Sequence, residues 1–124
     1  MKNKNLSIAA LLGLIAVVLG AFGAHTLKDK IGIDALSNFE TGVRYQMYHV
    51  IVLLFVNMFT SFSSKIKNGI SLFFFFGILF FSGSLYAISA LGINPKSIWF
   101  ITPLGGLLLA LGWIKLSISF FKSK

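Results

Sequence analysis

The sequence lacks cysteine and carries little charge. None of its 124 residues is cysteine, which excludes disulfide bonds, thiolate metal sites and a cysteine nucleophile. Only 11% of the residues are charged and 56% are hydrophobic, whereas a soluble domain has about 25% charged residues. The chain therefore has too little polar surface for a soluble protein. We expect one integral membrane domain over residues 1–124.

Acidic residues are scarcer still, with three of them against eleven lysines and arginines, and the net charge is +8. The basic residues lie at the ends of apolar runs and form no cluster with interleaved aromatic residues. This placement argues against nucleic acid as a partner and favours contact with a membrane surface. The expected partner is the lipid bilayer, including its anionic headgroups.

Four apolar runs approach the roughly 20 residues that a helix needs to cross a bilayer. They predict transmembrane helices over residues 6–24, 43–62, 69–91 and 98–117. A more polar stretch with helical periodicity precedes the second run, and Asp34 is its predicted N-cap. The predicted fold class is an all-α membrane protein, a four-helix transmembrane bundle with an amphipathic section leading into the second helix.

The charge distribution predicts the orientation of the four spans. An even number of spans places both termini on one side, where the segments carry seven basic residues and no acidic ones. The opposite side carries four basic residues and all three acids. Because basic residues mark the cytoplasmic side of a membrane, both termini are predicted to be cytoplasmic.

Small residues form smooth stripes on the first and fourth spans, and such stripes allow helices to approach closely. They also permit assembly into a homo-oligomer or with a membrane partner subunit. The glycines expected to serve helix packing are Gly13, Gly20, Gly83, Gly105 and Gly106.

Most side chains that could carry chemistry lie between residues 39 and 49. Three of them share one arc of the second span, which should face the bundle interior because polar groups are costly against lipid. His25 ends the first span on the same outer side. We therefore predict a polar cluster near the outer leaflet, approached by Tyr86 or Thr102 from neighbouring helices. Its predicted members are His25, Tyr45, Gln46 and His49.

Glu40 and Arg44 lie one helical turn apart on a different side of the same segment. This spacing predicts an ion pair. An exposed pair of this kind contributes only about 0.3–0.5 kcal/mol, so a structural role and a role as a gate or partner contact are both open.

Four short motifs are distributed over the predicted spans. They are GAFGAH at 20–25, FxTGxxYQMYH at 39–49, FSGSLY at 81–86 and TPLGG at 102–106. Together they resemble the YgdD/YwdK-like family of small bacterial membrane proteins, a domain of unknown function with relatives among small mitochondrial membrane proteins. The resemblance implies a four-helix protein of the bacterial cytoplasmic (inner) membrane. It implies no reaction.

Two interpretations of the polar cluster remain open. Interhelical hydrogen bonds contribute about 0.6–2 kcal/mol each, so the cluster can serve packing alone. This favours a non-enzymatic accessory or assembly protein that acts through helix and lipid contacts. The alternative is a small oligomeric channel or transporter with a polar outer site around residues 44–49, because intramembrane ionisable residues commonly mark transport pathways.

Metal and enzyme chemistry are not expected. His25 and His49 match no recognised metal motif and would make an incomplete site, so we predict no metal and no cofactor. The sequence contains no Gly-x-Ser-x-Gly elbow, no His-Glu-x-x-His and no phosphate-binding loop, each of which would indicate a reaction class. No catalytic residue is predicted, and we expect that the protein is not an enzyme.

Overall fold

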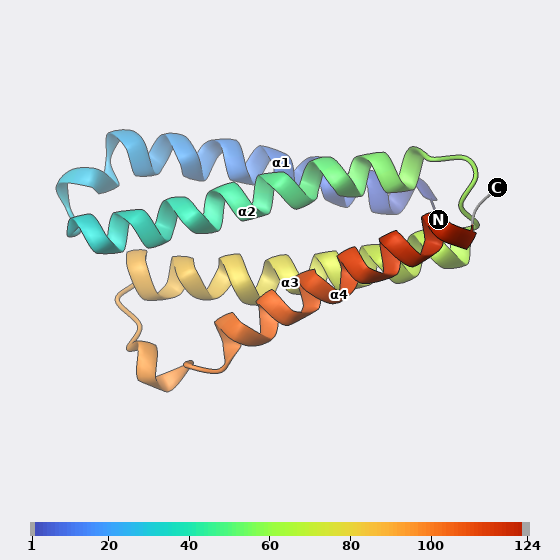
Figure 1. Ribbon diagram of the computed structural model, residues 1–124. Coiled ribbons are helices and arrows are strands. Elements are labelled where there is room, and N and C mark those ends of the chain that lie inside the picture. Colours follow the sequence, from blue (N-terminus) through green and yellow to red (C-terminus); the bar gives the residue numbers. More distant parts are fainter. Residues whose placement is uncertain (1, 123–124) are drawn as a thin grey trace.

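The computed structural model describes residues 2–122, which form four long helices (Figure 1). Two 3₁₀ helices, η1 (Leu27–Asp29) and η2 (Pro95–Ser97), lie in the longer connections. Met1, Ser123 and Lys124 lie outside the described residues, and Lys124 is one of the lysines used to predict the orientation. The long helices are α1 (Lys2–His25), α2 (Ile33–Met58), α3 (Ser64–Ala90) and α4 (Ile101–Lys122).

Helices that follow one another in sequence are also neighbours in space. α1 packs on α2, α2 on α3 and α3 on α4, whereas α1 approaches α3 only slightly. Figure 1 shows α1 and α2 running together above α3 and α4, with α4 inclined to the others. The start of α1, the α2–α3 turn and the end of α4 lie at one end, which we call the terminal end. η1 and η2 lie at the other, the loop end.

The predicted fold class is confirmed, since the structure is that of an all-α membrane protein. α1, α3 and α4 are each long and apolar enough to cross a membrane. α2 has 26 residues, but its first half carries Asp34, Glu40 and Arg44. Its composition alone does not identify it as a membrane span. Whether α2 crosses the membrane with the other three therefore stays a prediction.

The helix bounds differ from those of the predicted spans, and α2 begins and ends earlier than the sequence indicates. Gly32, not Asp34, is its N-cap residue, and Asp34 lies in the first turn, where a negative charge favours the free N–H groups of the helix start. The apolar run suggests a helix to Phe62, but α2 ends at Met58 and the chain turns there.

α3 begins earlier than predicted because Ser63 caps it. The Ser63 hydroxyl accepts a hydrogen bond from the backbone N–H of Ile66 at 3.2 Å, which satisfies one of the free donors of the first turn. α4 starts at Ile101 and not at 98, because the chain turns at 98–100 after η2. Pro103 lies in the first turn of α4, where its missing N–H has no helical partner to lose.

The core lies where α2, α3 and α4 meet, with the small-residue stripe of α1 packed against α2. Ala9 and Ala16 of that stripe are fully buried, and a side chain at Gly13 would touch Val50. The central apolar residues are Leu53, Val56, Ile70, Phe74, Ile78 and Leu109. α1 is therefore attached through one face, and its other face is exposed.

Candidate functional site

Gln46 is the centre of a polar network that joins three helices. Its side chain is 2% exposed. The amide nitrogen donates to the backbone oxygen of Leu12 in α1 at 2.7 Å. The amide oxygen accepts a hydrogen bond from the hydroxyl of Tyr86 in α3 at 2.7 Å. One side chain of α2 therefore holds α1 and α3 in a single register.

Gly42 lets α3 approach α2 one turn before Gln46. A Cβ atom at Gly42 would lie 2.8 Å from the ring of Tyr86. The backbone oxygen of Gly42 also accepts a hydrogen bond from the Ser82 hydroxyl at 2.7 Å. The glycine thus makes room for the tyrosine that reaches Gln46.

His49 connects α2 to α4. Its imidazole Nε2 accepts a hydrogen bond from the indole N–H of Trp113 at 3.0 Å, and Nδ1 lies 2.6 Å from the backbone oxygen of Tyr45. An indole nitrogen can only donate, so Nε2 carries no hydrogen and Nδ1 donates to Tyr45. The surroundings therefore select one neutral tautomer of His49, and protonation at Nε2 must break the bond to Trp113.

Replacing His49 with phenylalanine should leave the indole N–H of Trp113 without an acceptor. In a Trp99→Phe background, where Trp113 is the only indole, the hydrogen-bond marker band of the ultraviolet resonance Raman spectrum should shift. We expect a stability loss of about 1 kcal/mol, the size of one interhelical bond. His25→Phe serves as the control and should leave the band unchanged. An unshifted band in His49→Phe would contradict the assigned tautomer.

The structure does not bring His25 to the predicted cluster. His25 is exposed at the loop end. A side chain at Gly23 of α1 would touch Phe39 of α2, which sets the register of the two helices. His49 lies ten residues beyond Phe39, roughly 15 Å along the axis at 1.5 Å per residue. The end of α1 lies beside the first half of α2, whereas His49 lies in its second half, so the two histidines are far apart.

Of the two predicted neighbours from other helices, Tyr86 joins the polar cluster and Thr102 does not. Tyr86 reaches Gln46, but Thr102 bonds to Ser84 and joins α4 to α3 instead. The side chain of Tyr45 is 40% exposed and its ring packs against Phe81 with centroids 4.8 Å apart. Tyr45 therefore contributes its backbone oxygen to the network and its ring to the surface.

The ion pair between Glu40 and Arg44 stays a prediction, and in this structure the Arg44 side chain has a different partner. The guanidinium of Arg44 donates to the Thr41 hydroxyl at 3.1 Å, and Thr41 donates to the backbone oxygen of Ser37 at 3.0 Å. Both charged residues line a shallow groove of about 280 Å³ on the surface between α1 and α2. An exposed ion pair gains little free energy over hydration of the two charges, so a hydrogen bond from Arg44 to a neighbouring hydroxyl can compete with it.

A second polar network lies toward the terminal end, around Asn57, which is 3% exposed. Its amide oxygen accepts from Asn5 of α1 at 3.0 Å, and its amide nitrogen donates to Ser71 of α3 at 2.8 Å and to the backbone oxygen of Leu53 at 2.9 Å. Asn5 also donates to Asn68 at 2.8 Å. The sequence places Asn57 on the same arc as Gln46, but only the register of the helices shows which residues it meets.

The glycines predicted to serve packing do not behave alike. Gly105 is the tightest, since a Cβ there would lie 2.2 Å from the backbone nitrogen of Phe81. Gly13 and Gly20 face valines of α2 at 3.2 and 3.5 Å. Gly106 leaves 3.8 Å to Phe81, and a Cβ at Gly83 would meet nothing within 4 Å. Gly83 therefore makes no close helix contact.

The networks leave few polar groups free for chemistry. Every described side-chain nitrogen or oxygen that is fully buried has a hydrogen-bond partner. Within residues 2–122, no three histidine, aspartate or glutamate side chains gather as a metal site would require. The arrangement can hold helices in register, and nothing in it points to catalysis.

Comparison with known proteins identifies relatives over nearly the whole length. A family model described as "Protein of unknown function (DUF423)" matches residues 19–106. A UPF0382 membrane protein of Haemophilus influenzae is 44% identical over 124 residues, which are 100% of this chain and 98% of the relative. UPF0382 membrane proteins of Staphylococcus saprophyticus and Bacillus subtilis, the latter named YwdK, are 43% and 39% identical, each over 93% of this chain and 94% of the relative. No solved structure matches.

Proposed function

Because this chain belongs to the DUF423 family of membrane proteins of unknown function, we propose a role that its helix contacts support. The protein is a non-enzymatic accessory or assembly protein of the bacterial cytoplasmic membrane. It acts through contacts with lipid and with other transmembrane helices, as a homo-oligomer or beside a partner subunit. Both termini lie in the cytoplasm, a placement that the lysines at the terminal end support.

The observation that carries this proposal is the contrast between the interior and the surface. Polar side chains of the interior are hydrogen-bonded to other side chains or to backbone oxygens, as Gln46 is to α3 and α1. The outer face of α1 is apolar and exposed, with Leu14 and Val17 58% and 61% exposed. Of the three long apolar helices, α1 buries the smallest share of its residues within the protein, so it has the most surface left for another transmembrane helix.

A channel or transporter is the competing function. It would need polar groups that are open to a solute, whereas both nitrogens of His49 and both the nitrogen and the oxygen of the Gln46 amide make hydrogen bonds within the protein. No observation in the structure favours this function over the first. Solute flux through the protein would be the result that identifies a channel or transporter.

A photocrosslinker placed at Val17 in intact cells tests the accessory role. Benzoylphenylalanine at this outward position of α1 should yield a protein adduct of discrete mass. The same probe at Leu79 of α3, which is 59% exposed, should yield lipid adducts alone. Val17 and Leu79 have matched exposure, so the difference reports the unpartnered face of α1.

The opposite results are equally clear. If Val17 and Leu14 both give lipid adducts only, α1 has no helix partner and the proposal is wrong.

Purified protein in vesicles should show no more solute flux than vesicles without protein. Flux that disappears in His49→Ala while the fold is retained would establish the transporter instead.

A further inference from the structure

A long apolar groove runs along the lipid-facing side of α3 and α4. One part, of about 650 Å³, is lined by Phe76, Phe80, Leu104 and Leu108 among others. It adjoins a second part of about 360 Å³ that continues toward the terminal end. Phe73 and Lys115 line both parts, so the two form one continuous depression, called here the α3–α4 groove.

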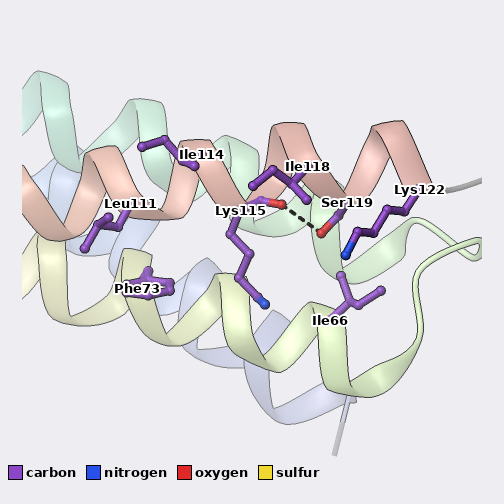
Figure 2. A pocket seen from close by; sticks show the side chains of 8 residues that line it. All are labelled: Ile66, Phe73, Leu111, Ile114, Lys115, Ile118, Ser119 and Lys122. Carbon is purple, nitrogen blue, oxygen red and sulfur yellow. Dashed lines mark hydrogen bonds between the residues drawn. The ribbon is translucent and has the colours of Figure 1, made fainter.

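Two lysines lie in the terminal half of this groove. Lys115 and Lys122 both line it and are seven positions apart on α4, which is two helical turns and puts them on one face. Figure 2 shows both ammonium groups directed from α4 toward α3. Among the residues that line this part of the groove, the hydrogen bond present joins the Ser119 hydroxyl to the backbone oxygen of Lys115, and it uses neither ammonium group.

Gly69 of α3 holds Lys115 within the groove. A Cβ at Gly69 would lie 2.6 Å from Cε of Lys115, so the lysine stem lies flat against the bare backbone of α3. Lys115 is roughly 10 Å farther from the terminal end than Lys122, at 1.5 Å per residue. The groove thus presents positive charge at two depths of the same leaflet.

No acidic residue is available to neutralise these lysines. All three acids of the chain, Asp29, Asp34 and Glu40, lie in η1 and the first half of α2, toward the loop end. An ammonium group next to hydrocarbon is favoured by an anionic partner. Lipid phosphate is the anion that a membrane supplies at this depth.

We propose that the α3–α4 groove binds one anionic phospholipid, with the phosphate between Lys115 and Lys122 and an acyl chain along Phe76, Phe80 and Leu104. The lysines supply the charge that complements the phosphate, and the aromatic and leucine side chains supply the apolar surface that complements the chain. This site is independent of the accessory role, because it stands on the groove and its lysines. The same lipid site would be present if the protein were a transporter.

Native mass spectrometry of the full chain tests the site with defined lipids. Delipidated protein is mixed with phosphatidylglycerol and phosphatidylcholine that carry identical acyl chains. The wild type should retain phosphatidylglycerol preferentially. Lys115→Met and Lys122→Met should each lower that preference about fivefold, as expected for removing one lysine near a lipid phosphate. Lys65→Met, at the same end but outside the groove, should leave it unchanged.

Two further variants separate the charge from the apolar part. Gly69→Ala keeps every charge but displaces Lys115, so it should also lower the preference for phosphatidylglycerol. Leu104→Trp fills the groove and should lower the retention of both lipids. Equal effects of Lys65→Met and Lys115→Met would overturn the site, since they would show general attraction alone. Displacement of the lipid by millimolar inorganic phosphate, with Leu104→Trp silent, would show a phosphate site instead and would also overturn the proposal.

Discussion

Gly105→Ala should destabilise the protein by about 3 kcal/mol, at the upper end of the range for overpacked interiors. The added methyl group would lie 2.2 Å from the backbone nitrogen of Phe81 and 2.7 Å from its Cα. Backbone atoms cannot rotate away as a side chain can, so α4 must move off α3. The loss should appear as a lower midpoint in thermal unfolding followed by circular dichroism in detergent.

Gly106 and Gly83 provide matched controls for this substitution. Gly106→Ala would place its methyl 3.8 Å from the ring of Phe81, and Gly83→Ala would meet nothing within 4 Å. Both should be neutral or slightly stabilising, because alanine is favoured over glycine inside a helix by about 1 kcal/mol. If Gly105→Ala unfolds at the same temperature as Gly106→Ala, α3 and α4 do not touch at this point.

Gln46→Leu should cost about 2 kcal/mol, because it removes the hydrogen bonds to the Tyr86 hydroxyl and to the Leu12 carbonyl. Leucine keeps most of the volume of glutamine, so the loss reports the hydrogen bonds more than the packing. Unfolding in dodecyl sulfate, followed by loss of helicity, gives the free-energy difference. A loss no greater than that of an exposed substitution would mean that the amide does not bridge the helices.

A double-mutant cycle with Tyr86→Phe distinguishes a bond from simple polarity. In the wild type, Tyr86→Phe removes the donor and leaves the amide oxygen of Gln46 unpaired. In the Gln46→Leu background the same change removes a hydroxyl that has already lost its partner. The second effect should therefore be smaller by about 1 kcal/mol, and additive effects would contradict the contact.

The sequence predicts α1, α3 and α4 well because each is a long apolar run, which has few stable forms other than a spanning helix. The end of α2 is different. The apolar residues continue to Phe62, but the helix stops at Met58 so that Phe59 and Phe62 can pack on each other and on Phe120 of α4. Such aromatic packing depends on residues distant in sequence, so no local sequence pattern predicts it.

The same limit explains which functional and packing residues the sequence could supply. The helical arc identifies Gln46 and His49 because both would be costly against lipid. It does not identify Gly77 and Gly112, which lie inside uniformly apolar runs. Added Cβ atoms there would come within 2.5 Å of Leu109 and 2.6 Å of Phe74. Where every face is apolar, periodicity carries no information about which face meets a neighbouring helix.

The serial packing of the helices has a consequence for how the chain enters the membrane during synthesis. α2 alone is too polar to be an obvious membrane span, but when it leaves the ribosome its first partner is already made. The partners in α1, Asn5 for Asn57 and the Leu12 carbonyl for Gln46, are synthesised before α2. The partners in α3, Ser71 and Tyr86, are synthesised after it. We therefore expect α1 and α2 to insert as a hairpin, in which α1 supplies hydrogen-bond partners for the polar side chains of α2.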